Sequence, residues 1–157
     1  EDKRITFLLG LEKLYERPMG RLSGGELQSI FIAVALIKDA DIVLLDEPSA
    51  FLDVEQRLRV AKLIRARAEL METPCFVVDH DLQFLDIISD RAIIFEGEPG
   101  RNGHASAPCG LDEGMNRFLK SVGITFRRDP QTGRARANKE GSQKDQEQKA
   151  EGRYYYG

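Results

Sequence analysis

The chain is poor in the features that would mark several classes of protein. Its 157 residues include only two cysteines, Cys75 and Cys109, which form no C-x-x-C motif and so offer neither a disulfide framework nor a cysteine metal site. No apolar run approaches the ~18 residues of a membrane-spanning helix, and no signal peptide is visible. The formal net charge is -3, so the chain as a whole lacks the basic charge that favours binding to nucleic acid. We therefore expect a cytoplasmic protein with one domain-sized core and no membrane partner.

Apolar periodicity predicts alternating helices and strands over most of the chain. The strands are continuous apolar runs, which is typical of strands buried on both faces of a parallel sheet. The alternation predicts an α/β fold with crossover connections. Helices are expected at 7–15, 26–38, a long segment that follows Asp53, 81–89 and 111–122, and strands at 41–46, 74–80, 91–97 and, as an edge strand, 124–129.

The C-terminal stretch differs in composition from the rest. Residues 130–152 contain no large apolar side chain, and residues 127–157 hold eight Lys and Arg against five Asp and Glu. Such a segment cannot bury much apolar surface, so we expect it to be extended or a solvated helix held by its neighbours. Its basic charge suits contact with a polyanion, or serves only to keep the tail solvated.

The stretch RLSGGELQS, residues 21–29, places Ser23, Gly24 and Gly25 immediately before a predicted helix. A helix N-terminus presents free amide groups and partial positive charge, and glycines let a phosphate approach the backbone closely. The pattern therefore fits a terminal phosphate. It also fits an ordinary N-cap and turn.

A second stretch, IVLLDEPSAFLD at residues 42–53, places Asp46 and Glu47 at the carboxyl end of a predicted strand. Ligands of open α/β sheets bind at that edge. At that edge, Asp46 is placed to hold hydrated Mg²⁺, and Glu47 is placed to orient or deprotonate the attacking water of phosphoryl transfer. His80 ends the following strand, so we expect it beside the two acids. Acids that simply form a turn are the alternative.

These motifs resemble, in order and spacing, those of the ATP-binding cassette (ABC) ATPases. LSGGE at 22–26 is similar to the signature motif, IVLLDE at 42–47 to Walker B, and SAFLD at 49–53 to the D-loop. The resemblance implies ATP and Mg²⁺ as ligands. It also implies roles for the motif residues. Ser23, Gly24 and Gly25 would contact the γ-phosphate of ATP held by an opposite cassette, and Glu26 belongs to the same ATP-binding motif. Asp46 would hold Mg²⁺ through water, Glu47 would be the general base, His80 the γ-phosphate sensor, and Ser49 and Asp53 would lie between cassettes.

Three longer stretches resemble the C-terminal half of the ribosome-recycling ABC ATPases of subfamily E, the RNase L inhibitor family: DEPSAFLD, GMNRFLKSVGITFRRDP and NKEGSQKDQEQKAEGRYYY. The resemblance implies a second cassette in the same protein, an N-terminal iron–sulfur domain, and splitting of ribosomal subunits with the small subunit and release or rescue factors as partners. It divides the chain into residues 1–122, part of a nucleotide-binding domain, and 123–157, a hinge-like tail with Arg127 and Arg128. A solvated basic end is the alternative for these two arginines.

The chain also departs from the family pattern. Asp79 stands before His80, where the family usually has Glu. Ser29 stands directly after LSGGELQ, where the family normally has Arg, so we expect a salt bridge beside the helix that begins there to be missing. No G-x-x-x-x-G-K-[ST] occurs, so the P-loop and its strand are absent, as are cysteines for an iron–sulfur cluster. We therefore expect the isolated chain not to hydrolyse ATP, and to expose apolar faces and an open sheet edge that make it marginally stable or aggregation-prone.

Three interpretations of the whole chain follow. Its first residue is Glu1 rather than Met, which favours a fragment of a longer subfamily E ATPase. A stand-alone half-cassette that completes a partner in trans is the second interpretation. Another soluble ABC ATPase, of DNA-repair or chromosome type, is the third, but those proteins carry long coiled coils and no heptad run occurs here.

Overall fold

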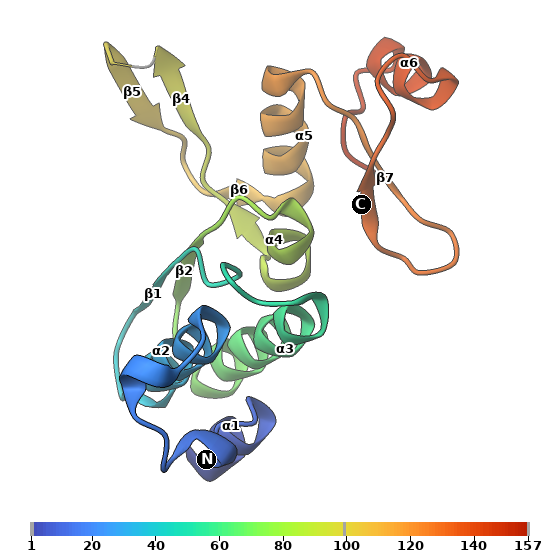
Figure 1. Ribbon diagram of the computed structural model, residues 1–157. Coiled ribbons are helices and arrows are strands. Elements are labelled where there is room, and N and C mark those ends of the chain that lie inside the picture. The colour runs from blue at the N-terminus through green and yellow to red at the C-terminus, as the bar shows by residue number, and fades with distance from the viewer. Residues whose placement is uncertain (1, 99, 157) are drawn as a thin grey trace. The chain divides into compact units, whose positions relative to one another are not determined.

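The computed structural model describes residues 2–98 and 100–156, and the chain divides between Ile88 and Ser89 into two compact units (Figure 1). The first unit has helices on one side of a pair of strands. In chain order its elements are α1 (Asp2–Leu8), two 3-10 turns (Glu12–Leu14 and Met19–Arg21), α2 (Gly24–Ile37), β1 (Val43–Asp46), α3 (Val54–Met71), β2 (Cys75–Val78) and α4 (Leu82–Ile88).

The second unit contains short antiparallel pairs and two helices. Strand β3 pairs with β6, β4 with β5, and β7 with β8. Its elements are β3 (Arg91–Ala92), β4 (Phe95–Glu98), β5 (Asn102–Ala105), β6 (Cys109–Gly110), α5 (Leu111–Val122), β7 (Phe126–Arg128), β8 (Ala135–Ala137) and α6 (Gln143–Ala150). The predicted division at residue 122 thus differs from the division into compact units, and as a functional boundary it stays a prediction.

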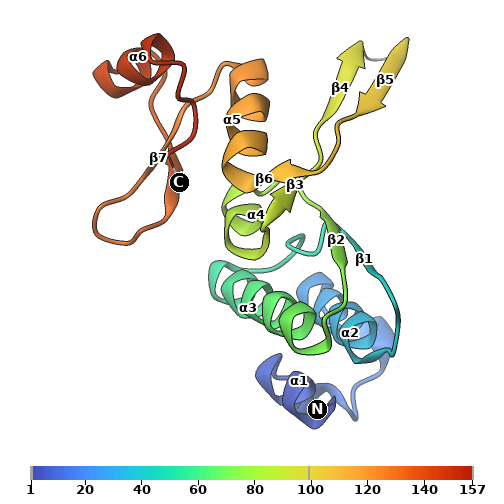
Figure 2. The same cartoon turned by 180° about the vertical axis from the view of Figure 1, so that it is seen from behind.

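Strands β1 and β2 run parallel, with helices α2 and α3 packed against one face of the pair (Figure 2). Val43 and Leu45 point into this layer and are buried, while the intervening Leu44 points the other way. The α/β architecture with parallel strands is therefore confirmed. The core of the unit lies between the strands and the helices, around Leu36, Val60 and Ile64.

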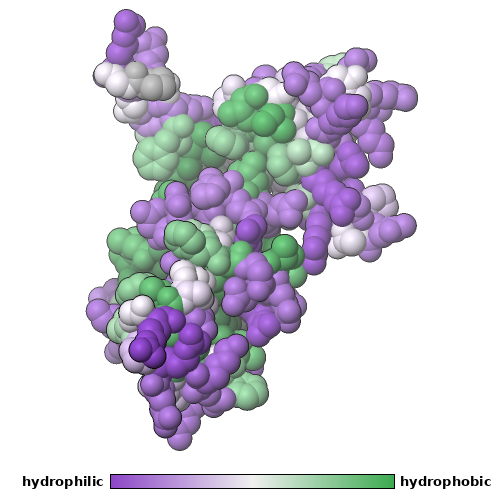
Figure 3. Space-filling view, viewed as in Figure 1, coloured by the Kyte–Doolittle hydropathy of each residue, from purple (hydrophilic) through white to green (hydrophobic). Residues whose placement is uncertain are grey.

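The other face of the strand pair is uncovered, so the expectation of strands buried on both faces is wrong for this chain. Leu44 is 73% exposed and Val78 is 63% exposed, and Phe76 lies beside them. Figure 3 shows apolar surface next to β1 in this unit. Among the described residues β1 and β2 pair only with each other, which leaves the open edges and apolar face expected from the missing P-loop strand.

The long helix α3 begins where the sequence predicts. The Gln56 amide donates to Asp53 Oδ1 at 2.8 Å, and the Asp53 amide donates to Gln56 Oε1 at 3.2 Å, which together form a capping box. Asp81 serves α4 in a similar way, because its Oδ1 accepts from the amides of Gln83 and Phe84. The predicted N-cap at Asp53 and the predicted position of Asp81 are both confirmed.

The predicted third strand at 91–97 is wrong as a single sheet strand. The structure divides it into β3 and β4, and each pairs with a strand from residues 102–110, where the sequence predicted no strand. Gly97 has φ 140°, and a Cβ there would lie 2.2 Å from the Asn102 carbonyl oxygen. A close hairpin is therefore available locally, and it takes the place of pairing with the distant β2.

The expectation that residues 130–152 bury little apolar surface is confirmed, and α6 is the largely exposed helix, held by its neighbours, that was expected there. This stretch folds with β7 around buried polar side chains rather than apolar ones. The Thr125 hydroxyl donates to Asp145 Oδ1 at 2.6 Å and accepts from the side-chain Nδ2 of Asn138 at 2.9 Å. Gln148 donates to the Phe126 carbonyl at 2.8 Å and bonds Asn138. Because each buried polar group has partners, a network of hydrogen bonds replaces the missing apolar core.

We predict that Asp145→Asn lowers the stability of this polar core and weakens its dependence on acid pH. Hydrogen bonds from Thr125, then Lys149 and the Gly141 amide, lower the pKa of Asp145 from 3.8 to about 2. A lowered folded-state pKa gives stability that is complete above pH 3.8 and is lost as the pH falls towards 2. The measurement is amide hydrogen exchange of residues 125–138 at pH 7 and at decreasing pH.

Glu147→Gln is the matched control, because it removes an exposed carboxylate from the same helix. Equal exchange rates in the Asp145 and Glu147 variants at neutral pH would contradict a stabilising role for the buried carboxylate.

Candidate functional site

Two predicted site residues meet at the carboxyl edge of the parallel pair. The Oε1 atom of Glu47 lies 3.5 Å from Nδ1 of His80, and both side chains are more than half exposed. Asp46 is the last residue of β1, opposite Val78, and is also exposed. A carboxylate pair and an imidazole therefore share one solvent-facing edge, as the sequence predicted.

The backbone holds Glu47 in an unusual conformation. Its φ is 45°, in the left-handed region that costs a non-glycine residue on the order of 1 kcal/mol or more. Two hydrogen bonds hold it there: the Glu47 amide donates to the Val78 carbonyl at 2.7 Å, and Gln28 Nε2 donates to the Glu47 carbonyl at 3.1 Å. The strained turn fixes the point from which the carboxylate projects.

Asp79 joins the loop after β1 to the loop after β2. The Ser49 amide donates to Asp79 Oδ2 at 3.0 Å, and the Ser49 hydroxyl donates to Oδ1 at 2.8 Å. The Asp81 amide also donates to Oδ1 at 2.8 Å. Because Ser49 is only 4% exposed, this carboxylate satisfies a buried hydroxyl and amide. Sequence reasoning noted Asp79 only as a substitution, since its partner lies thirty residues away in the chain.

A second connection between these loops comes from Arg57 on α3. Its Nη1 atom lies 2.8 Å from Asp81 Oδ2, and its Nε donates to the Leu52 carbonyl at 3.0 Å. Sequence reasoning missed this residue too. Nothing in the chain near Arg57 shows which loops it will contact.

The Ser-Gly-Gly stretch forms the start of α2 with a capping box. The Ser23 amide donates to Glu26 Oε2 at 2.8 Å, and the Glu26 amide donates to the Ser23 hydroxyl at 3.3 Å. Hydrogen bonds from Ser23, its backbone amide foremost, and from Arg17 hold the pKa of Glu26 below its ordinary value. Ser23 is therefore the N-cap of α2, as the alternative interpretation expected. The amides of Gly24 and Gly25 lie in the first turn of the same helix.

Both glycines lie close to the loop after β1, and Gly25 leaves no room for a side chain. A Cβ at Gly25 would lie 2.8 Å from the Phe51 carbonyl oxygen, and one at Gly24 would lie 3.3 Å from the Phe51 ring. Phe51 itself has φ 61° and is 80% exposed. The predicted signature motif and the predicted D-loop of this chain are thus in direct contact.

Ser29 forms no salt bridge, but Glu26 on the same helix forms one with Arg17. Arg17 Nη1 lies 2.6 Å from Glu26 Oε1, so Glu26 has a cationic partner that the sequence did not indicate. The Ser29 hydroxyl instead donates to the Gly25 carbonyl at 2.9 Å.

The two arginines predicted for the hinge-like tail are bound within the second unit. Arg127 donates to Asn138 Oδ1 at 2.7 Å, while Arg128 donates to the Gly133 carbonyl at 2.9 Å and to the Tyr155 hydroxyl at 3.3 Å. Their guanidinium groups therefore help to hold the tail together.

Two negative findings apply to residues 2–98 and 100–156. No group of three or more His, Cys, Asp or Glu side chains is arranged to hold a metal ion. No helix in the same ranges is long and apolar enough to cross a bilayer.

Residues 2–50 match the ABC transporter family. An uncharacterised ABC transporter ATP-binding protein of Methanocaldococcus jannaschii is 63% identical over 94% of this chain, and the translation initiation factor RLI1 of Saccharomyces cerevisiae is 46% identical over 94%. The chain covers 25% and 24% of these relatives, so it spans about a quarter of their length.

Solved structures agree with the sequence relatives. In a structure of ribosome-bound archaeal Pelota and ABCE1, the matching chain superimposes on this one with a TM-score of 0.93 and 60% sequence identity. The match covers 99% of this chain and 26% of that chain. This chain also matches the archaeal ribosome recycling factor, solved with a ribosomal stalk protein, with a TM-score of 0.90, 59% identity and 98% coverage, 30% of that chain. The chain belongs to the RNase L inhibitor family of ABC ATPases, subfamily E.

In this subfamily E chain, we predict that Asp79→Asn loosens both loops of the site. Asparagine keeps one acceptor oxygen but cannot satisfy the three donors of Ser49 and Asp81. Loss of hydrogen bonds to a charged group costs roughly 1.5–3 kcal/mol, so the amides of Ser49 and Asp81 should exchange about tenfold faster or more. NMR hydrogen exchange measures this.

Asp41→Asn removes an exposed acid from the same unit and serves as the control. Unchanged protection of Ser49 in the Asp79 variant would show that the carboxylate does not hold the two loops.

Proposed function

We propose that this chain contributes the catalytic edge of an ATP-hydrolysing cassette that works with a second cassette to split ribosomal subunits. The observation that supports it most is the meeting of Glu47 and His80, 3.5 Å apart, at the carboxyl edge of parallel strands. This is the place where α/β folds bind phosphate ligands.

The chemistry follows from the side chains at this edge. Glu47 takes the proton of the attacking water, and His80 bonds an oxygen of the γ-phosphate. Asp46 would hold hydrated Mg²⁺, and the ion would supply positive charge to neutralise the phosphates. One exposed carboxylate suits magnesium, because that ion keeps several waters and otherwise binds the substrate's own phosphates.

The start of α2 acts on a nucleotide held by a second cassette. The amides of Gly24 and Gly25 and the hydroxyl of Ser23 offer donors at a helix N-terminus, which favours a phosphate. Glu26 keeps this turn in shape through its bonds to Ser23 and Arg17. Ser49 and Asp53 lie in the loop that contacts the partner cassette, and Asp79 fixes that loop relative to His80.

The larger assembly is proposed from the relatives. One is named a translation initiation factor, and others were solved with a ribosomal stalk protein or bound to the ribosome together with Pelota. We assign this chain the same class of partners: the small ribosomal subunit, release or rescue factors, and the second cassette. Within it, residues 123–157 form a hinge-like tail, and any iron–sulfur cluster belongs to another part of the full protein.

A half-cassette that completes a partner in trans is the second candidate. The uncovered apolar face of Leu44, Phe76 and Val78 favours it, because such a face gains stability when another segment covers it.

We predict that the purified 157-residue chain shows no ATP turnover above background, because it has no G-x-x-x-x-G-K-[ST] motif to hold its own nucleotide. Glu47→Gln should leave that background unchanged. ATP turnover by the wild-type chain that disappears in the Glu47→Gln variant would contradict this prediction.

The proposed chemistry is testable in a chimera in which this chain replaces the matching quarter of a full-length archaeal relative. We expect an active ATPase that splits ribosomal subunits, and a loss of about 10²–10⁴-fold in turnover with Glu47→Gln. Asp41→Asn in the same chimera should retain activity. A fully active Glu47→Gln chimera would contradict the role of this carboxylate.

A further inference from the structure

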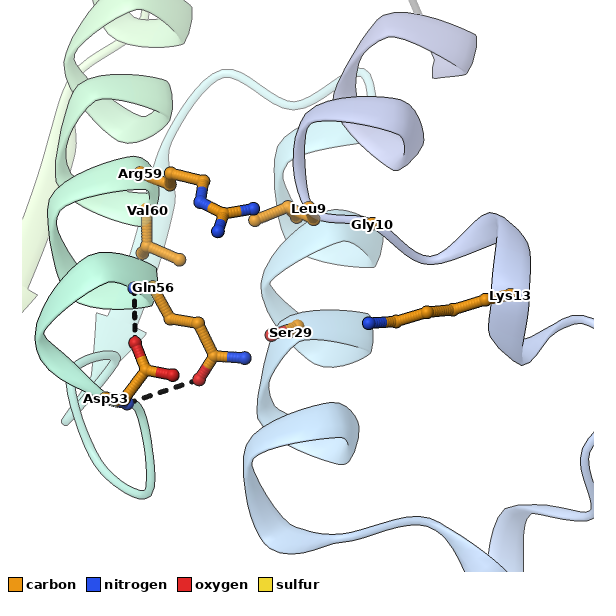
Figure 4. Close-up of a pocket in the computed structure, with 8 residues that line it drawn as sticks. All are labelled: Leu9, Gly10, Lys13, Ser29, Asp53, Gln56, Arg59 and Val60. Carbon is orange, nitrogen blue, oxygen red and sulfur yellow. Dashed lines mark hydrogen bonds between the residues drawn. The ribbon is translucent and has the colours of Figure 1, made fainter.

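A small cavity of about 220 Å³ lies in the first unit (Figure 4), and neither Glu47 nor His80 belongs to its lining. Three separate stretches of chain surround it: the residues that follow α1, the first half of α2, and the first turns of α3. Because all three belong to one compact unit, the cavity is a feature of that unit alone.

The floor of the cavity is closed and neutral. Ser29 is 4% exposed and Val60 is fully buried beneath the space. The Ser29 hydroxyl donates its proton to the Gly25 carbonyl. Since serine is short, no large side chain of α2 fills the space above it.

Two donors reach over this floor from opposite walls. In Figure 4 the Lys13 ammonium and the Gln56 amide nitrogen point toward one another across Ser29. Gln56 Oε1 accepts from the Asp53 amide, which leaves Nε2 as the end that faces the cavity. Within residues 2–98 and 100–156, Lys13 has no hydrogen bond or ion pair.

Arg59 adds a third donor group from the next turn of α3. One of its nitrogens donates to Glu55 Oε1 at 2.8 Å, and its guanidinium makes no other hydrogen bond among the residues that the structure describes. Among the charged residues of the lining, Lys13 and Arg59 are positive and Asp53 is negative. Asp53 Oδ1 already accepts from the Gln56 amide, and the adjoining helix N-terminus adds partial positive charge.

We propose that this cavity is a binding site for a phosphate group, held by Lys13, Gln56 and Arg59. Two of the three charged lining residues are cations, and charged donors on an oxyanion give the strongest hydrogen bonds. The volume is below the ~300–1,000 Å³ of pockets that enclose larger ligands, so the site takes a single phosphate and not a whole nucleotide.

Binding there acts on the loop that the proposed function uses. Gln56 forms the capping box with Asp53, so a phosphate on Gln56 Nε2 stiffens the start of α3 and the residues before it. The proposal itself does not depend on ATP hydrolysis, because the cavity lies within one unit and needs no second cassette.

The test is a titration of the folded chain, followed by NMR chemical shifts of the Gln56 side-chain amide, with inorganic phosphate in one arm and glycerol phosphate in the other. Lys13→Gln and Arg59→Gln should each weaken binding about tenfold, the effect of losing one charged hydrogen bond. Lys62→Gln, on the same helix but outside this cavity, is the matched control and should change binding less than about twofold.

Saturable binding of inorganic phosphate identifies a free-anion site. Binding of the ester alone identifies a phosphate carried by a larger molecule. Either result supports the proposal when the variants behave as stated. No saturable shift in either arm overturns it, as does equal weakening by Lys62→Gln, which indicates general attraction to a basic surface. Unchanged amide spectra of the free variants exclude unfolding as the cause.

Discussion

The pairing of β1 with β2 is the constraint on which the candidate site depends. The strands are parallel with Asp46 opposite Val78, and the ladder continues one step further through the bond from the Glu47 amide to the Val78 carbonyl. That bond ends the pairing and coincides with the left-handed turn at Glu47. A slip of one residue would turn Leu45 outward and Leu44 into the core, and would move His80 away from Glu47.

Hydrogen bonds between loops turn this edge into a defined arrangement. Asp79 binds Ser49 and the Asp81 amide, and Arg57 binds Asp81 and the Leu52 carbonyl. Capping boxes at Ser23 and Asp53 then set where α2 and α3 begin. The two halves of the chain use opposite solutions for their cores: aliphatic packing around Leu36 and Ile64 in the first, and a satisfied polar network around Thr125 and Asp145 in the second.

The sequence predicted those parts of the fold that depend on local patterns. Helix α3 after Asp53, helix α5 and the two parallel strands follow from apolar periodicity and caps, and the meeting of Glu47 and His80 follows from the edge rule for parallel strands. The hairpin of β4 and β5 was missed because a nearby turn competed with a distant strand. The polar core that holds the tail was not predicted, because apolar counts cannot register a core built from Thr125, Asn138 and Gln148. The contacts of Asp79, Arg17 and Arg57 were missed, since their partners are fixed only once the chain has folded.

The placement of the candidate site is tested most directly by an NMR measurement of the coupling across the hydrogen bond between the Glu47 amide and the Val78 carbonyl. We expect a detectable coupling between these two groups, because the register places Glu47 beside His80 through this bond. A coupling from the Glu47 amide to a different carbonyl, or a rapidly exchanging amide with none, would contradict this placement.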